Sequence, residues 1–253
     1  MRAPTDTQAS GDWALFLDVD GTLLDIAETP EGVYVPDDLK TQLLELSLRA
    51  NGALALVSGR SIDDLDRLFA PLRLCASGVH GCERRDATGR IVRPIVDTDA
   101  LPVVRRELQQ FVDQHPGLLL EDKGFAIAVH FRRVPYMSGD VLSVMRRLCQ
   151  WLGPRFTLQS GKCVLEIRPT GFSKGTSIAA FMSEAPFAGR RPVFLGDDVT
   201  DEDGFAVVND LGGVSIKVGE SPTTLARGRL RGVREVRHWL QTMPLPVLAW
   251  NRL

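Results

Sequence analysis

The chain alternates between short apolar runs and longer segments with helical periodicity. The apolar runs lie at residues 13–17, 53–57, 74–77, 192–195 and 213–218. Continuous apolar runs of this length are typical of strands that are covered on both faces. The expected helices span residues 37–50, 62–68, 174–184, 201–207 and 233–241. Strands that alternate with helices in this way predict an α/β fold with a Rossmann-like parallel sheet.

The pattern changes between residues 97 and 168. Here a helix at 101–114 precedes strands at 118–122 and 125–131, and a helix at 141–152 precedes strands at 156–159 and 163–167. The turns are expected at Lys123-Gly124 and Ser160-Gly161, because glycine adopts turn conformations readily. This repetition predicts a small α+β unit with an antiparallel sheet. We therefore expect a discontinuous core domain, residues 12–96 and 169–246, with residues 97–168 inserted as a second domain.

Composition narrows the class of protein. The 253 residues carry a net charge of −2, so neither a nucleic acid nor an anionic membrane is an expected partner. No stretch approaches the roughly 20 apolar residues that a membrane helix needs. The four cysteines form no Cys-x-x-Cys pair, which favours buried thiols in a reducing compartment. We expect a cytoplasmic protein that is a monomer or a weak oligomer and acts on a small molecule.

Polar residues follow three of the apolar runs directly. Asp18 and Asp20 follow the first run, Ser58 follows the second, and Asp197 follows 192–195, while Lys174 opens a helix. The carboxyl ends of parallel strands lie along one edge of a sheet, so these groups are expected to converge. Adjacent carboxylates repel each other and need a hard divalent cation or a shared proton. The set suits magnesium-assisted phosphoryl transfer.

Each of these clusters alone has a simpler interpretation. Asp-x-Asp-Gly can be a turn or part of a calcium loop, although a calcium loop needs Gly and Glu where this chain has Leu23 and Thr29. A lone Ser-Gly-Arg is usually a turn, and a lone lysine at a helix start is usually a surface charge. The functional interpretation depends on finding all of them in this order.

That order resembles the four motifs of the haloacid-dehalogenase-like (HAD) phosphohydrolases. The resemblance implies that Asp18 is a nucleophile that becomes phosphorylated, and that Asp20 is a general acid and base. It implies that Mg²⁺ is held by Asp18, Asp197 and the main-chain carbonyl of Asp20. Ser58 and Lys174 are expected to contact the transferring phosphoryl group. The remaining implied features are metal-bound waters oriented by Asp198 and Asp201, and a type-2 cap formed by the inserted domain.

A narrower resemblance, to the trehalose-6-phosphate phosphatase family, covers residues 18 to about 219. It is carried by Ser58-Gly59-Arg60, Gly78-x-His80-Gly81-x-Glu83, Glu121-x-Lys123, His130-x-Arg132, Gly161-Lys162 with Glu166, and Gly196 to Glu202. This family hydrolyses trehalose 6-phosphate to trehalose and phosphate with magnesium. The implied substrate-binding residues are Gly21, Thr22, Arg60, His80, Glu83, Glu121, Lys123, Arg132, Lys162 and Glu166.

Strand parity agrees in part with this assignment. Glu121 and Lys123 are expected to share a strand face, as are His130 and Arg132, and Lys162 and Glu166. Such a face can meet the hydroxyls of a sugar with donors and acceptors, or it can simply be solvated.

Three other functions compete with this one. The first is a related phosphatase for another sugar phosphate, such as sucrose 6-phosphate. The second is a signalling receiver domain, which also gathers acidic groups and a lysine at strand ends but is about half this length. The third is an inactive regulatory module on the same fold, which the intact Asp18 and Asp20 argue against.

Overall fold

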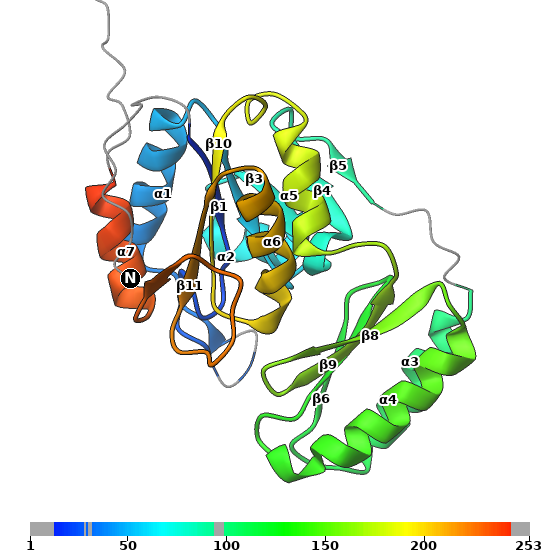
Figure 1. The fold of residues 1–253 in the computed structure, drawn as a ribbon. Helices are drawn as coiled ribbons and strands as arrows, with labels where there is room; N and C mark the ends of the chain where they lie inside the picture. Colours follow the sequence, from blue (N-terminus) through cyan, green and yellow to red (C-terminus); the bar gives the residue numbers. More distant parts are fainter. Residues whose placement is uncertain (1–12, 28, 30–31, 94–98, 244–253) are drawn as a thin grey trace, which may run out of the picture. The chain divides into compact units, whose positions relative to one another are not determined.

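The computed structural model describes residues 13–27, 29, 32–93 and 99–243. The chain forms two compact units (Figure 1). The first contains Met1–Arg93 and Ser173–Leu253, and the second contains Pro94–Phe172. The expected domain boundary between residues 96 and 97 lies outside the described residues. The division at the other end falls after Phe172.

The first unit is built on an eight-stranded sheet in the order β12-β11-β10-β1-β2-β3-β4-β5. Six strands run parallel: β1 (Trp13–Leu17), β2 (Leu54–Val57), β3 (Cys75–Gly78), β10 (Arg191–Gly196), β11 (Val214–Val218) and β12 (Gly228–Leu230). The last two, β4 (Glu83–Arg85) and β5 (Ile91–Val92), are antiparallel. The apolar runs predicted the five longer parallel strands. They did not predict β4 or β12, which are short and contain charged residues.

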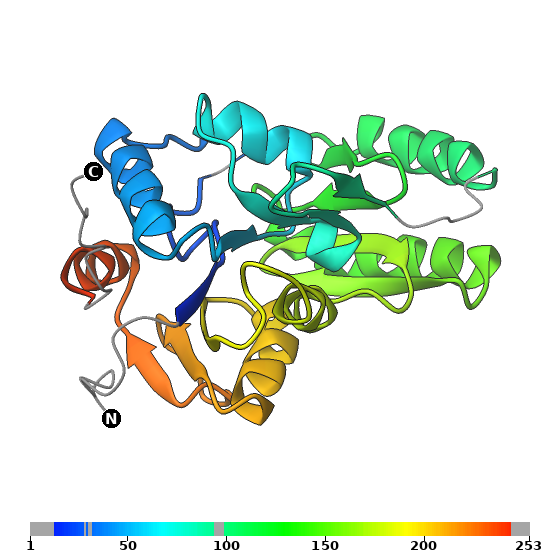
Figure 2. The same ribbon diagram turned by 90° about the horizontal axis from the view of Figure 1, so that it is seen from above.

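Helices cover both faces of this sheet, because successive side chains of each strand point to opposite sides. On one face lie α1 (Asp37–Arg49), α2 (Ile62–Phe69) and α7 (Val233–Thr242), and on the other lie α5 (Lys174–Met182) and α6 (Glu202–Asp210) (Figures 1 and 2). Alternate residues of β1 serve the two cores: Leu15 packs in the first, and Phe16 in the second beside Phe181. The predicted mixed α/β fold with a large parallel sheet is confirmed.

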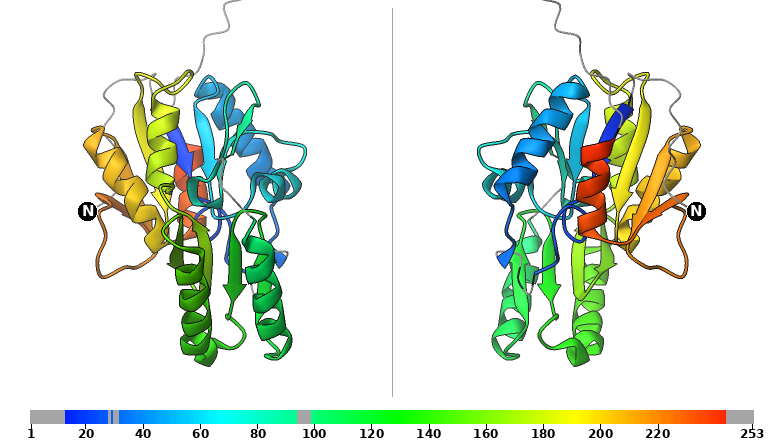
Figure 3. Two further views of the ribbon diagram at one scale, coloured as in Figure 1. Left: turned by 90° about the vertical axis from the view of Figure 1, so that its right-hand side faces the viewer. Right: turned by 90° about the vertical axis from the view of Figure 1, so that its left-hand side faces the viewer.

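The second unit has a four-stranded antiparallel sheet in the order β6-β7-β9-β8. Its strands are β6 (Leu119–Asp122), β7 (Ile127–His130), β8 (Phe156–Gly161) and β9 (Val164–Pro169). Two helices, α3 (Leu101–Asp113) and α4 (Ser138–Leu152), lie side by side and pack on one face of the sheet (Figure 3). A short 3₁₀ turn, η3 (Pro135–Met137), precedes α4. The opposite face carries most of the polar side chains of the sheet, among them Glu121, His130 and Glu166.

One predicted turn in this sheet is wrong. β8 continues through Gly161, which pairs with Val164, so the two-residue connection is Lys162–Cys163 and not Ser160–Gly161. The sequence placed glycine at the centre of the turn because glycine favours positive φ. In the structure, Cys163 takes the positive φ of 61°.

Among the described residues, no helix is both long and apolar enough to cross a membrane.

Candidate active site

The turn after β1 brings two acidic segments together. Asp18 continues from β1, and its amide donates to the carbonyl of Leu195 on β10 at 3.0 Å. Gly21 adopts a φ of +85°, and a Cβ there would lie 2.2 Å from Oδ2 of Asp197. No larger residue fits that space without displacing the Asp197 carboxylate. Gly21 therefore serves close packing of the two acidic segments.

A buried lysine lies between two carboxylates beside this turn. Lys174 Nζ is 2.7 Å from Oδ1 of Asp18 and 2.7 Å from Oδ1 of Asp201. The exposed fractions of Lys174, Asp18 and Asp201 are 3%, 3% and 0%. Lys174 is the first residue of α5, which begins with a capping box formed by Ser173 and Thr176. The cap fixes the start of the helix and so the origin of the lysine side chain.

Burial dominates the electrostatics of this cluster. It raises the pKa of Asp18 well above the usual value, and Asp201 and Asp197 raise it further, while Lys174 opposes the shift. Burial also raises the pKa of Asp201, again against Lys174. For Lys174 burial alone would lower the pKa, but Asp18 and Asp201 outweigh it and raise the pKa above its usual value. The cluster thus has more carboxylates than one ammonium neutralises.

These carboxylates fit a hard divalent cation. Asp18, Asp197 and Asp201 each offer a carboxylate oxygen, and the three atoms lie within 4.8 Å of one another. Oxygen ligands with excess negative charge are what Mg²⁺ prefers. Asp201 is the least available of the three, since Oδ1 accepts from Lys174 and Oδ2 accepts from the amide of Asp198 at 2.9 Å. Oδ2 of Asp18 accepts no hydrogen bond from the described part of the chain.

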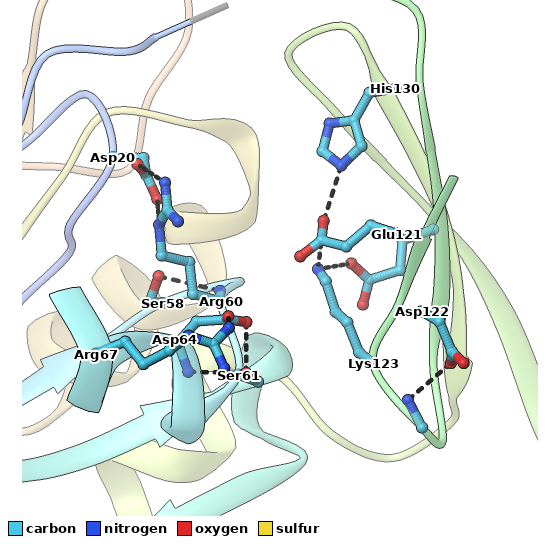
Figure 4. A network of polar contacts seen from close by, with 12 residues as sticks. Asp20, Ser58, Arg60, Ser61, Asp64, Arg67, Glu121, Asp122, Lys123 and His130 are labelled. Carbon is cyan, nitrogen blue, oxygen red and sulfur yellow. Dashed lines mark hydrogen bonds and ion pairs between the residues drawn. The ribbon is translucent and has the colours of Figure 1, made fainter. Parts of the chain in front are cut away.

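The Asp20 carboxylate is held by an arginine. Arg60 Nε lies 2.7 Å from Oδ2 of Asp20, and Nη2 lies 2.8 Å from Oδ1 (Figure 4). The main-chain amide of Arg60 donates to Oγ of Ser58 at 3.1 Å. Ser58 is buried directly after β2, as predicted from the apolar run. Arg60 therefore connects two of the predicted motifs: it follows Ser58 in the chain, and it holds the carboxylate of Asp20.

His80 lies against the Ser58–Arg60 loop. Its amide donates to the carbonyl of Ser58 at 3.0 Å, and a Cβ on Gly59 would lie 2.6 Å from His80 Nε2. His80 is part of the short turn η2 (Val79–Gly81), in which Val79 and His80 both have positive φ. Such angles in residues other than glycine are rare and occur most often at functional sites.

Glu83, also predicted to bind substrate, makes hydrogen bonds that stabilise the fold. Its Oε2 accepts from the amide of Ile62 at 2.8 Å, and Arg93 Nε lies 3.1 Å from Oε1. The first contact satisfies an amide at the start of α2, where Ser61 also caps the helix as predicted.

Thr22 and Asp198 occupy two further predicted positions. Thr22 is fully buried, and its hydroxyl has no hydrogen-bond partner among the described residues. Asp198 is half-buried and accepts from the amide of Val199, so it caps the short turn η4 (Val199–Asp201). This turn leads directly into α6.

The polar face of the second unit carries an ordered row. Strand register places Glu121 beside Ala128, Ala128 beside Glu166, and Glu166 beside Gln159. Lys123 Nζ lies 2.6 Å from Glu166 and 3.7 Å from Glu121, and His130 Nε2 lies 2.7 Å from Glu121 (Figure 4). The predicted parity of Glu121 and Lys123 fits these contacts.

Arg132 and Lys162 lie outside the strands. Arg132 follows β7 in a turn and donates to the main-chain carbonyl of Lys162 at 3.0 Å. Lys162 is exposed in the connection between β8 and β9. The predicted shared face of Lys162 and Glu166 is therefore wrong, because the turn lies later than expected.

Lys217, which the sequence did not single out, and Glu202, the last residue of the Gly196 to Glu202 motif, support the Asp197 segment. Lys217, on β11, donates to the main-chain carbonyl of Asp198 at 3.0 Å. Glu202, at the start of α6, lies 3.4 Å from Lys217 Nζ. The available signal was a lysine inside a predicted buried strand, Val214–Val218, whose other residues carry no charge.

Comparison with known proteins agrees with this geometry. A family model described as trehalose-phosphatase matches residues 16–229. Trehalose-6-phosphate phosphatase of Escherichia coli (strain K12) is 47% identical over 234 residues, covering 92% of this chain and 87% of that protein. A probable trehalose-phosphate phosphatase of Sinorhizobium fredii (strain NBRC 101917 / NGR234) is 44% identical over 234 residues, covering 92% of this chain and 88% of that protein.

Solved structures agree on the fold. A trehalose-6-phosphate phosphatase related protein matches with a TM-score of 0.77 and 29% identity, covering 91% of this chain and 96% of that one. A haloacid dehalogenase-like hydrolase from B. subtilis matches with a TM-score of 0.63 and 14% identity, covering 91% of this chain and 99% of that one, and shows the fold alone. The chain is a phosphatase with a HAD-like fold, and it belongs to the trehalose-phosphatase family.

Proposed function

We propose that this protein hydrolyses trehalose 6-phosphate to trehalose and phosphate, with Mg²⁺, through a phosphorylated Asp18. The observation that carries the mechanism is the pairing of buried Asp18 with Lys174 beside Asp197. The similarity to trehalose-phosphate phosphatases of Escherichia coli and Sinorhizobium fredii supports the substrate.

The first step is attack by Asp18 on phosphorus. Lys174 holds Oδ1 of Asp18, which leaves Oδ2 as the attacking atom. A bond forms between Oδ2 and phosphorus, and the bond from phosphorus to the sugar oxygen breaks. Mg²⁺, when bound by Asp18, Asp197 and the main-chain carbonyl of Asp20, supplies positive charge to the phosphoryl oxygens. Ser58 and Lys174 donate hydrogen bonds to the same oxygens.

Asp20 acts first as the general acid and then as the general base. A sugar alkoxide is a poor leaving group, so Asp20 protonates the departing oxygen. The resulting carboxylate then takes a proton from the water that attacks phosphorus. The bond from phosphorus to Oδ2 of Asp18 breaks in this step, which releases phosphate and restores the Asp18 carboxylate. Because Arg60 engages both carboxylate oxygens of Asp20 in this structure, Asp20 must release at least one of these contacts to act. Arg60 is then available to the substrate.

Sugar recognition is assigned to the polar face of the second unit. Glu121, Lys123 and Glu166 present carboxylates and an ammonium in an ordered row, which suits the hydroxyls of two glucosyl units. The remaining members of the proposed substrate-binding set are Gly21, Thr22, Arg60, His80, Glu83, Arg132 and Lys162. Glu83 is the member of this set whose contact in the structure serves the fold, because it accepts from the amide of Ile62 at the start of α2.

The same proposal makes the second unit a cap. In that role it excludes water until Asp18 is phosphorylated, and it then releases the sugar. We place the hinges of this cap at the two points where the chain crosses between the units. One, near residue 97, lies outside the described residues, and the other is near Pro169. A cytoplasmic location and a monomeric or weakly oligomeric state also stay predictions.

A substrate panel tests the proposal. Phosphate release is measured with trehalose 6-phosphate, sucrose 6-phosphate, glucose 6-phosphate and p-nitrophenyl phosphate, each with Mg²⁺ or with a chelator. We expect the highest kcat/KM for trehalose 6-phosphate and no turnover with the chelator. A preference for sucrose 6-phosphate would favour the competing sugar-phosphate phosphatase. The absence of turnover on every substrate would favour the regulatory module.

A further inference from the structure

Lys217 is a buried lysine outside the groups that act on the substrate. It lies on β11, paired with Gly196 of β10, and only 3% of its side chain is exposed. Its Nζ donates to the main-chain carbonyl of Asp198 at 3.0 Å. Lysine is almost never fully buried unless it is paired, because removing its charge from water is costly. Its position therefore needs an explanation beyond packing.

The carbonyl that Lys217 contacts belongs to the turn that carries Asp197. The same oxygen accepts from the amide of Asp201 at 3.2 Å, and the amide of Asp198 donates to Oδ2 of Asp201 at 2.9 Å. Asp201 thus fixes the turn from within, and Lys217 fixes it from the neighbouring strand. Partners that orient metal-ligating residues contribute strongly to metal affinity.

Glu202 in turn orients Lys217. Its Oε1 lies 3.4 Å from Lys217 Nζ and accepts from Oγ1 of Thr224 at 2.9 Å. Its Oε2 accepts from the amide of Leu225 at 2.7 Å, so the carboxylate is held on both sides. The ring of Phe205 lies 5.8 Å from the ammonium. The ammonium of Lys217 is therefore held between α6, which carries Glu202 and Phe205, and the turn that carries Asp198.

We propose that Lys217, oriented by Glu202, is a positioning residue that holds the Asp197–Asp198 turn in the geometry that binds the divalent cation. This inference rests on the proposed magnesium site. It places Lys217 in contact with neither the cation nor the substrate. A purely structural ion pair would change the melting temperature without changing the affinity for Mg²⁺, so the two roles can be separated.

The test compares Lys217→Met with Lys40→Met in the full chain. Methionine keeps the length and apolar stem of lysine but removes the ammonium. Lys40, on α1, serves as a control because its Nζ also donates to a main-chain carbonyl, that of Ala70 at the end of α2, at 3.0 Å. Metal-free proteins are titrated with MgCl₂, and binding is followed by calorimetry and by the rise in melting temperature.

We expect Lys217→Met to bind Mg²⁺ about 10- to 100-fold more weakly, as is typical when an outer partner of a metal ligand is lost. Lys40→Met should bind like the wild type. At saturating Mg²⁺, kcat of Lys217→Met should lie within about 10-fold of the wild-type value. The main change should be a higher half-saturating Mg²⁺ concentration. Wild-type Mg²⁺ affinity in a folded Lys217→Met protein would overturn the inference.

A second variant covers the case in which Lys217→Met does not fold. Glu202→Gln keeps the shape of the side chain but removes the charge that orients Lys217, and we expect a smaller loss of Mg²⁺ affinity, about 3- to 10-fold. Unchanged affinity would overturn the inference here too. A wild-type protein that binds no Mg²⁺ would overturn both this inference and the proposed magnesium site, whereas failure of the variants alone leaves that site intact.

Discussion

Each unit of this protein places a lysine between two carboxylates, but the two arrangements suit different tasks. In the first unit, Lys174 lies 2.7 Å from both Asp18 and Asp201, with Asp197 adding a further negative charge. In the second unit, Lys123 lies 2.6 Å from Glu166 and 3.7 Å from Glu121, which has His130 as another partner. The first cluster has an excess of carboxylates and favours a cation. The second has comparable numbers of donors and acceptors and favours sugar hydroxyls.

The largest expected effect comes from Asp18→Asn, which keeps the size of the side chain but removes the nucleophile. Turnover of every phosphate ester should fall by at least about 10³-fold, as expected when a nucleophile is removed. Phosphate release under saturating substrate measures it. Activity within about 10-fold of the wild type would mean that catalysis does not pass through Asp18.

Mg²⁺ should affect the two clusters very differently. Because the cation relieves repulsion among Asp18, Asp197 and Asp201, hydrogen exchange should slow in residues 18–22 and 197–201. Exchange in β6 and β7 should not change. Mass spectrometry of metal-free protein, with and without MgCl₂, measures both. Equal slowing in both units would contradict a cation site confined to the first cluster.

The third prediction compares Lys174→Met with Lys123→Met. The first variant leaves Asp18 and Asp201 buried without their counter-ion and should lose about 3–5 kcal/mol of unfolding free energy at pH 7. The second should lose less, since only Glu166 lies close to Lys123, at 2.6 Å, while Glu121 is 3.7 Å away and retains His130. Urea denaturation measures both.

The loss of unfolding free energy in Lys174→Met should depend on pH in a definite direction. Without the ammonium, the pKa of each buried carboxyl in the folded state lies still further above its unfolded value. Such groups favour the folded state when protonated, and this contribution is lost as the pH rises through the folded pKa. The deficit relative to wild type should therefore be smaller at pH 5 than at pH 7. A larger deficit at pH 5 would contradict the burial argument.

The smallest effect is expected from Glu121→Ala, with Asp122→Ala as a neighbouring control. Glu121 lies on the proposed sugar-binding row, whereas Asp122 forms an ion pair with Arg105 at 2.6 Å and is more exposed. We expect Glu121→Ala to raise KM for trehalose 6-phosphate about 10- to 100-fold, the loss for a hydrogen bond to a charged group. The KM for p-nitrophenyl phosphate should stay the same, and Asp122→Ala should change neither. An unchanged KM for trehalose 6-phosphate in Glu121→Ala would remove Glu121 from the sugar site.

The sequence predicted the architecture because its strongest signals were long and periodic. Apolar runs specify parallel strands, and parallel strands bring their carboxyl ends to one edge, so Asp18, Ser58 and Asp197 could be placed without coordinates. β4 and β12 were missed because Glu83–Arg85 and Gly228–Leu230 are short and contain charges, and only pairing with a neighbour reveals them as strands.

Side-chain partners were harder to predict than positions. Arg60 was expected at the substrate, and the sequence held no sign that it engages Asp20 bidentately. Lys162 was assigned to a strand face, whereas it lies in the connection between β8 and β9, because this turn lies two residues later than its glycine suggested. The position of Lys217 beside the Asp197 segment depends on the register between β11 and β10, which a single sequence does not specify.

The most direct test of the central claim is to trap the phosphorylated enzyme. The wild-type protein is mixed with trehalose 6-phosphate and Mg²⁺, quenched in acid within milliseconds, and treated with borohydride, which reduces an aspartyl-phosphate to homoserine. Peptide mass spectrometry then locates the change. We predict homoserine at position 18, and none there when substrate is omitted. Rapid turnover with unmodified Asp18 at every quench time, or modification at another aspartate, would contradict the account.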